Sequence, residues 1–486
     1  MIDDETSTDR TSVTSNPVMN PVELQQGLVE AGRILRGFYE GLEGRRVRPA
    51  RPLREIALGL EGSLGEEGVG LAAALADVEE RLLPDTMAVP HPLYLGLINS
   101  SPMAGGVVAE SIIGGLNNNS GSWEQAPSFV AAEQEVVRTF AGLLGLARDT
   151  SGILLPGGSY AALHALQLAR DARLPAWRRD GLRALSGNPR VYVSDASHFS
   201  AARAALAIGV AERDIVRVPT LGRGRMDPDA LAALLREDKT NGALPFALVA
   251  TLGTTGTGAM DSLPRLVELC REHGLWLHVD ACYGGAGALL EEVVDRFEGI
   301  EQADSVAVDP HKWFFVPMVA GLLFTRHADL ELQVYDIDAP YIPTGDLIDP
   351  FRRAIPTSRR CAGFAVWLAL RAHGLGAVRK AVRRTVELAR RLEQELAKQG
   401  FQVMEGGELS IACARWQPAG VSRERCDAMQ REIAAASVDS GEAWFGTVPA
   451  QGKTWLRFSL VSTFTRVEHI DRLARSLGEI ARSVPG

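Results

Sequence analysis

At 486 residues the chain is expected to hold two or three structural units, because one hydrophobic core rarely serves more than about 250–300 residues. Its 46% hydrophobic content is ordinary for a globular protein, and a net charge of −9 argues against nucleic-acid binding, which needs clustered basic surface. No apolar stretch approaches the roughly 18 residues of a membrane span, and the polar first residues contain no secretory signal, so we expect a cytoplasmic protein with no membrane partner.

The N-terminal hundred residues predict an arm. Residues 1–20 are polar and predict a disordered tail. Apolar residues recur at helical spacing over 21–43 and again over 71–83, with an Arg/Pro-rich linker between them. These elements are too thin for a core of their own, so residues 21–103 are predicted to form a helical arm that packs on something else, such as a second subunit.

Residues 104–372 predict a large α/β domain. Helical and strand patterns alternate, which is typical of a mostly parallel sheet covered by helices on both faces. The predicted elements are helix 129–146, helix 156–172, strand 190–194, helix 198–208, strand 246–252, helix 262–273, strand 275–280 and strand 304–308.

Residues 373–486 predict a small C-terminal α/β domain. A long charged helix over about 376–399 connects it to the large domain. The elements that follow are strand 409–414, helix 423–436, strand 455–461 and helix 466–482. The five cysteines of the chain are scattered without zinc-like spacing, which predicts reduced thiols and no metal site.

One lysine stands apart from the rest. Only five of the 51 lysines and arginines are lysines, and Lys312 alone lies in an apolar run, Val-Asp-Pro-His-Lys-Trp-Phe-Phe. A lysine that faces apolar groups is costly unless its pKa falls or its amine is consumed in a Schiff base. Asp280 ends a preceding apolar strand and could pair with the ring nitrogen of pyridoxal phosphate. Ligands of parallel sheets bind beyond the carboxyl ends of the strands, so both residues are expected at one edge.

Three further motifs follow predicted strands. In Leu-Leu-Pro-Gly-Gly-Ser-Tyr, Gly157, Gly158 and Ser159 could hold a phosphate at a helix N-terminus, although most such turns only cap helices. Thr255 could hydrogen-bond a ring substituent or belong to a structural turn. His198, in Ser-His-Phe-Ser, could lie on an aromatic cofactor or merely cap a helix.

Together these motifs resemble the group II pyridoxal-phosphate decarboxylases, which include aromatic-L-amino-acid decarboxylase and glutamate decarboxylase. The resemblance covers roughly residues 75–480 and implies the fold of type I pyridoxal-phosphate-dependent transferases. It implies that Lys312 forms the Schiff base and that Asp280 keeps the pyridine nitrogen protonated, so the ring accepts the electrons of the breaking Cα–carboxylate bond. It also implies a stacking role for His198, a ring contact for Thr255, and phosphate contacts for Gly157, Gly158, Ser159 and His311.

The resemblance assigns three more positions. Tyr341 lies where the family carries a loop tyrosine that protonates the substrate carbon; related aldehyde-forming enzymes often lose it or alter the histidine. Arg457 matches an arginine that meets the substrate carboxylate in some members, although a surface arginine at a strand edge would look the same. A homodimer with active sites at the interface is also implied, with Ser358 at a position where the other subunit reaches the cofactor phosphate.

The chain departs from the family in places. Leu97, Ile98, Asn99 and Ser100 replace the Tyr-Phe-Pro-Thr wall of the aromatic decarboxylases, and this loss of two rings favours an aliphatic or small polar substrate over a catechol. Nearer the lysine, Cys282 replaces a more usual alanine and Asp309 replaces a common asparagine, and neither change is expected to remove a chemical role.

The predicted activity is therefore decarboxylation of an L-amino acid, through an external aldimine and a quinonoid, to carbon dioxide and an amine. The alternatives on the same fold are an aminotransferase, a carbon–carbon lyase or a decarboxylating aldehyde synthase. A non-catalytic scaffold is a further alternative, against which the complete set of catalytic residue types argues.

Overall fold

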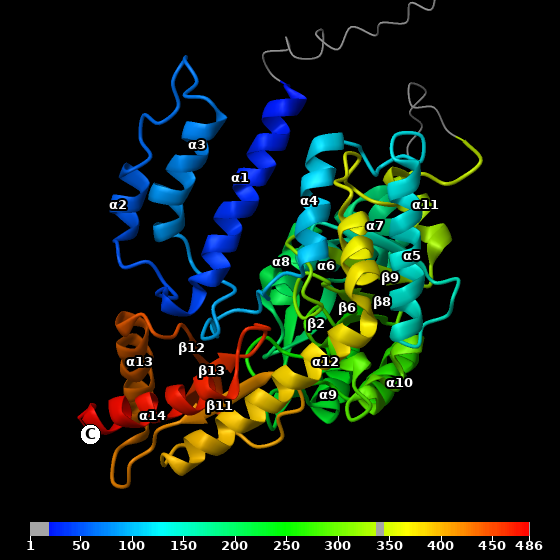
Figure 1. The fold of residues 1–486 in the computed structure, drawn as a ribbon. Helices are drawn as coiled ribbons and strands as arrows, with labels where there is room; N and C mark the ends of the chain where they lie inside the picture. Colours follow the sequence, from blue (N-terminus) through cyan, green and yellow to red (C-terminus); the bar gives the residue numbers. More distant parts are fainter. Residues whose placement is uncertain (1–18, 337–344, 486) are drawn as a thin grey trace, which may run out of the picture.

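The computed structural model describes residues 19–336 and 345–485, which form an arm, a large α/β domain and a small domain (Figure 1). The predicted tail therefore lies almost wholly outside the described residues, and so does Tyr341.

The large domain is built on a seven-stranded sheet in the order β1-β9-β8-β7-β6-β2-β3. The five strands from β8 to β3 pair in parallel, as predicted, whereas β9 runs antiparallel to both β8 and β1. Only 12 residues separate β8 from β9 and they hold no helix, so the chain turns back instead of crossing over. The strands are β1 (Ser151–Leu155), β2 (Pro189–Ser194), β3 (Ile215–Val218), β6 (Leu244–Thr251), β7 (Trp276–Asp280), β8 (Ser305–Val308) and β9 (Gly321–Thr325).

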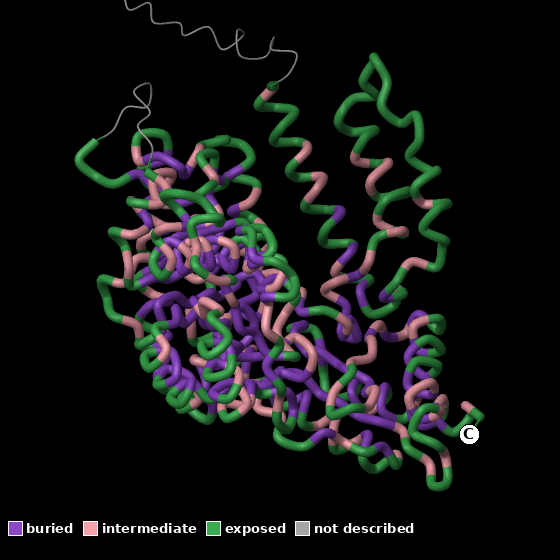
Figure 2. Tube along the Cα trace, turned by 180° about the vertical axis from the view of Figure 1, so that it is seen from behind, coloured by how far each residue is buried: buried purple, intermediate pink, exposed green. Residues whose placement is uncertain are grey.

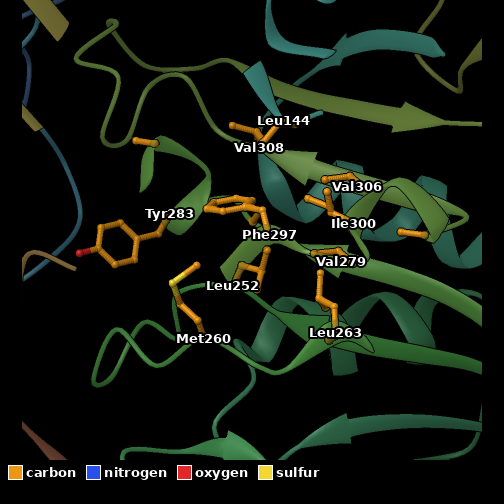
Figure 3. Close-up of a cluster of buried hydrophobic side chains, with 14 of the residues drawn as sticks. Leu144, Leu252, Met260, Leu263, Val279, Tyr283, Phe297, Ile300, Val306 and Val308 are labelled. Atoms are coloured by element: carbon orange, nitrogen blue, oxygen red, sulfur yellow. The ribbon is translucent and has the colours of Figure 1, made fainter. Parts of the chain in front are cut away.

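Helices cover both faces of this sheet because its strands are apolar on both sides. In β6, Ala247 and Val249 pack with α6 and α8, whereas Leu248 and Ala250 face the core shared with α9 and α10. Figure 3 shows part of the core that Leu248 and Ala250 face. The helices are α4 (Ala104–Leu116), α5 (Pro127–Leu143), α6 (Gly158–Arg173), α7 (Pro175–Asp180), α8 (Phe199–Ala207), α9 (Pro228–Thr240), α10 (Leu263–His273) and α11 (Ala328–Tyr335).

A long helix joins the large and small domains. Helix α12 (Ala362–Lys398) begins 14 residues earlier than the predicted helix at 376 and has a non-helical conformation at Gly374, with φ 76° and ψ 150°. The small domain carries an antiparallel sheet in the order β10-β11-β13-β12, with α13 packed on it and α14 packed against α12 and α13. Its elements are β10 (Gln402–Val403), β11 (Ile411–Arg415), α13 (Arg423–Ser440), β12 (Gly446–Ala450), β13 (Lys453–Ser459) and α14 (Val467–Ser483).

The arm stands away from both domains and meets them only at its base (Figures 1 and 2). Of helix α1 (Pro21–Glu40), only Ile34 and Phe38 are buried, and helices α2 (Leu53–Leu58) and α3 (Leu71–Asp77) have no buried residue. The arm leaves many large apolar side chains exposed: Val22, Leu24, Leu28, Val29, Leu35, Leu53, Leu58, Leu60, Leu64, Val69 and Leu71. Over 19–336 and 345–485, no helix combines the length and the apolar character needed to cross a membrane.

Candidate active site

A cavity of about 260 Å³ lies at the carboxyl edge of the parallel strands. It is bounded by the ends of β6 and β7, the turn after β8, and the segments that begin α6 and α8. This is the edge at which sheets of this kind bind ligands, and most of the predicted cofactor residues meet there. The predicted residues that line it are Gly157, Gly158, Ser159, His198, Thr255, Asp280, His311 and Lys312.

Lys312 does not face an apolar wall, so that expectation was wrong. The neighbouring Trp313 and Phe314 are buried in the core, whereas Nζ of Lys312 lies 2.9 Å from Oδ2 of Asp309. Burial alone would lower the pKa of Lys312, but the carboxylates of Asp309 and Asp280 outweigh burial and raise that pKa above its usual value. The amine is therefore held as an ammonium by an acid only three residues away.

Asp280 is placed to hold a cationic ring nitrogen. One oxygen of its carboxylate accepts a hydrogen bond from the backbone N–H of Cys282, at 3.1 Å. Burial acts to raise the pKa of Asp280, but the Lys312 ammonium and the Cys282 N–H outweigh it, so the pKa lies below the ordinary value. The carboxylate stays ionised and would favour the protonated form of a pyridine nitrogen beside it.

The start of α6 forms a cradle too tight for side chains. Gly157 adopts φ 87°, a conformation that favours glycine, and a Cβ on Gly158 would lie 2.6 Å from the sulfur of Cys282. A Cβ on Gly321 of β9 would in turn lie within 2.5 Å of the Gly157 backbone. Backbone amides at such a helix start bind phosphate well. His311 borders the cradle, with Nδ1 2.6 Å from the carbonyl oxygen of Ala320.

His198 both caps a helix and lines the cavity, so the two alternatives for it hold together. Its Nδ1 accepts the backbone N–H of Ser200 and lies 2.7 Å from the Ser200 hydroxyl oxygen. Burial lowers the pKa of His198, which favours the neutral ring. With Nδ1 occupied by Ser200, the other ring nitrogen remains for a ligand.

Thr255 lines the cavity and is tied to the small domain through Arg457. Nε of Arg457 donates to the carbonyl oxygen of Thr255 at 3.0 Å, and another of its nitrogens donates to the carbonyl oxygen of Gly96. Arg457 is buried, so it is not a surface arginine, and within the described part of the chain its Nη2 has no hydrogen-bond partner. Contact with a substrate carboxylate stays a prediction.

The predicted substrate wall, residues 97–100, does not line the cavity within this single chain. Leu97 is exposed, Ile98 is packed in the core, and the Ser100 hydroxyl lies 3.5 Å from the carbonyl oxygen of His311. Asn99 approaches the cavity indirectly, because its Nδ2 lies 3.1 Å from the sulfur of Met318, which is a lining residue. Ser358 is exposed, and its predicted role toward another subunit is untested.

Several lining residues were not predicted. Met318 and Val319 come from the loop between β8 and β9, where no motif marks them. Ser200 was visible in Ser-His-Phe-Ser, and its spacing of two residues from His198 could have suggested the hydrogen bond to the ring. Asp309 was noticed only as a harmless substitution, although an acid three residues before a lysine in a turn is close enough to pair with it.

Fold and site are those of a pyridoxal-phosphate-dependent enzyme: an amine, an ionised carboxylate and a glycine-rich helix start converge on one cavity. A family model described as the pyridoxal-dependent decarboxylase conserved domain matches residues 58–415, and the chain belongs to this family of carboxy-lyases.

Individual relatives agree with this family. An aromatic-L-amino-acid decarboxylase of Bacillus atrophaeus is 28% identical over 432 residues, which are 87% of this chain and 88% of the relative. The acidic amino acid decarboxylase GADL1 of Bos taurus is 30% identical over 79% of this chain and 76% of its own length. The crystal structure of Rhodiola rosea 4-hydroxyphenylacetaldehyde synthase matches with a TM-score of 0.89 and 25% identity, over 97% of this chain and all of that one.

Proposed function

We propose that the protein decarboxylates an L-amino acid to carbon dioxide and the corresponding amine, as a cytoplasmic homodimer. The observation that carries this proposal is the convergence of Lys312, Asp280 and His198 on the one cavity beside the α6 cradle. The cytoplasmic location is supported by the five cysteines, all of which are free thiols.

Each of these residues has a defined task in the proposal. Lys312 supplies the amine that carries the cofactor, and Asp280 holds the ring nitrogen protonated. Bound pyridoxal phosphate supplies an electron sink for the pair left on the substrate carbon when the carboxylate departs. Gly157, Gly158 and Ser159 hold the phosphate with backbone amides and a hydroxyl, and His311 closes that end of the cavity.

His198 and Tyr341 complete the proposed chemistry. A neutral His198 ring, oriented by Ser200, can lie against the cofactor ring without adding a positive charge beside the protonated pyridine. Tyr341 is proposed to deliver the proton that replaces the lost carboxylate, and Ser358 to reach the phosphate in the neighbouring subunit. Arg457 is proposed to meet the substrate carboxylate through the nitrogen that no backbone carbonyl occupies.

The proposed substrate is aliphatic or small and polar. Met318 and Val319, each about half exposed, form the open wall of the cavity, and Asn99 adds an amide behind them. Among the described residues, Tyr283 supplies the only phenyl or indole ring that lines the cavity, and it is 2% exposed, so little flat surface is offered on which an indole or catechol would stack. The printed names of the relatives span aromatic and acidic amino acids and therefore do not decide the class.

A panel of amino acids tests the proposal. Purified protein supplied with pyridoxal phosphate would be incubated with aliphatic, small polar, acidic, diamino and aromatic L-amino acids, and carbon dioxide, amine, aldehyde and keto acid would be measured. Equal amounts of carbon dioxide and amine are expected, with the highest kcat/KM for an aliphatic or small polar substrate. Keto acid without carbon dioxide would contradict decarboxylation, and aldehyde with peroxide would assign the aldehyde-synthase alternative. A Lys312→Ala variant is the control and is expected to release no carbon dioxide.

A further inference from the structure

We propose that Asp309 is a positioning residue that holds the nitrogen of Lys312 in its protonated form, and thereby sets the pH range over which the bond between lysine and cofactor stays protonated. The inference rests on the proposed function only in taking Lys312 as the lysine that binds the cofactor.

The carboxylate of Asp309 is fixed by the backbone around it. Its N–H donates to the carbonyl oxygen of Cys282 at 3.1 Å, which ties the turn after β8 to the end of β7. Its carbonyl oxygen accepts the N–H of Lys312 at 3.0 Å, closing a turn that places the two side chains together. The side chain of Asp309 is only 2% exposed, so its contact with Nζ, at 2.9 Å, is shielded from solvent.

The other oxygen of Asp309 is available inside the site. Oδ1 is buried and makes no hydrogen bond to any described residue, although Asp309 lines the cavity. A Cβ on Gly158 would lie 2.8 Å from Oδ2 and 3.3 Å from Oδ1, so the carboxylate lies directly against the start of α6. A buried carboxylate is costly unless a positive charge compensates it, and here the helix start and the ammonium both do so.

Among the titratable groups around Lys312, Asp309 is the one that can serve as its counter-ion. Asp280 faces the lysine from β7, but in the proposed function its charge is committed to the ring nitrogen. Burial raises the pKa of the Cys282 thiol and lowers the pKa of His198, so both are neutral near pH 7. His311 lies on the same turn, and its Nε2 is 3.9 Å from Oδ2 of Asp309, which is beyond hydrogen-bonding distance.

The covalent step conserves the charge that Asp309 faces. When the cofactor aldehyde binds, the Lys312 ammonium would give one proton to the aldehyde oxygen, and the freed lone pair would attack the aldehyde carbon. A second proton from the nitrogen would follow to the same oxygen, which would leave as water, while the nitrogen would keep the third proton on the new carbon–nitrogen double bond. A cation therefore stands beside Asp309 before and after the bond forms, and a carboxylate beside that nitrogen favours its protonated form in both states.

The test is a pH titration of the holoenzyme by absorbance. The protonated bond absorbs near 420 nm, an approximate value for such a cofactor, and the loss of this band with rising pH gives a midpoint. In Asp309→Asn, which keeps the shape but removes the charge, we expect the midpoint to fall by about one pH unit or more, a tenfold change in the proton equilibrium. Asp195→Asn is the matched control, because Asp195 is exposed and follows β2 at the same sheet edge. An unchanged midpoint in Asp309→Asn, or an equal shift in Asp195→Asn, would overturn the proposal.

A second measurement tests the proposal even if Asp309→Asn does not fold. Wild-type enzyme freed of its cofactor would be acetylated over a range of pH, and the extent of modification at each lysine followed by peptide mass spectrometry. We expect the midpoint for Lys312 to lie above those of the exposed Lys239 and Lys380, and a midpoint at or below theirs would overturn the proposal. Lys312→Ala separates this inference from the proposed function: if that variant kept the 420 nm band, the assignment of the cofactor lysine itself would fail.

Discussion

The large domain buries the apolar side chains of its strands, whereas the N-terminal arm leaves many large apolar side chains exposed. In the large domain, strands such as β6 and β7 are buried on both faces by helices of the same chain. In the arm, α1 buries only Ile34 and Phe38, α2 and α3 bury no residue, and this part of the tube is mostly exposed (Figure 2). Exposed apolar surface of this extent marks an interaction site in soluble proteins. The core of the large domain is therefore formed within one chain, whereas α1, α2 and α3 of the arm bury little of their apolar surface in it.

The largest expected effect lies in the large domain and leaves the arm untouched. Replacing Asp280 with Asn removes the charge that holds the ring nitrogen protonated but keeps the side-chain shape. We expect kcat/KM for decarboxylation to fall on the order of 100- to 1,000-fold, with no change in oligomeric state. Steady-state carbon dioxide release and sedimentation velocity measure the two quantities. Retention of more than a third of the activity would contradict the role of Asp280.

The second prediction compares leucines in the two regions. Leu277 of β7 is 1% exposed, whereas Leu28 of α1 is 47% exposed. Leu277→Ala leaves a cavity in the core and is expected to lower the free energy of unfolding by about 2–5 kcal/mol. Leu28→Ala is expected to change it by less than about 0.5 kcal/mol when the chain is diluted to a monomer. Urea unfolding of both variants tests this, and equal losses would erase the distinction between the regions.

The third prediction concerns the exposed apolar surface of α1. If a second copy of the chain covers this surface in the proposed homodimer, Leu24→Glu together with Leu28→Glu should place charges in an apolar interface. Dimerisation should then weaken at least tenfold. Sedimentation equilibrium measures the dimer dissociation constant. Leu182→Glu is the control, because Leu182 is a similarly exposed leucine (45%) of the large domain. A wild-type monomer, or equal weakening by the control, would contradict the proposal.

The last prediction, whose effect appears only in acid, concerns one buried histidine from the large domain and one from the arm. Burial lowers the pKa of His278, on β7, and of His91, in the last part of the arm, from 6.5 to about 4. Below pH 6.5 the unfolded chain binds protons that the folded chain does not, so stability should fall as pH drops from 6.5 toward 4. Urea unfolding at several pH values measures this slope. His278→Asn and His91→Asn should each flatten it, and an unchanged slope in both would contradict the assignment.

Much of the site was predictable because its residues are short-range features of strand ends. A strand that ends in Asp280 and a turn that carries Lys312 must meet if their strands are parallel neighbours, and the β7–β8 pairing confirms that they are. The glycine run before α6 and the histidine before α8 follow the same rule, since each begins a helix at the carboxyl end of a strand.

Other parts of the site could not be predicted because they depend on contacts between distant segments. Met318 and Val319 reach the cavity only because β9 turns back beside β8 and β1. Arg457 is tied to Thr255 and Gly96, which precede it by 202 and 361 residues. Contacts between segments so far apart in the chain cannot be predicted from the order of the helices and strands.

The sequence was enough to predict the α/β class and the motifs that line the cavity, because periodicity and strand-end motifs are local. Only the tertiary structure decided the charge state of the central lysine. From the sequence Lys312 was an amine in an apolar run, but the fold turns Trp313 and Phe314 into the core and aims Lys312 at Asp309 and into the cavity. A pKa is set by the charges that surround a group in space, and around Lys312 those come from the end of β7 and the turn after β8.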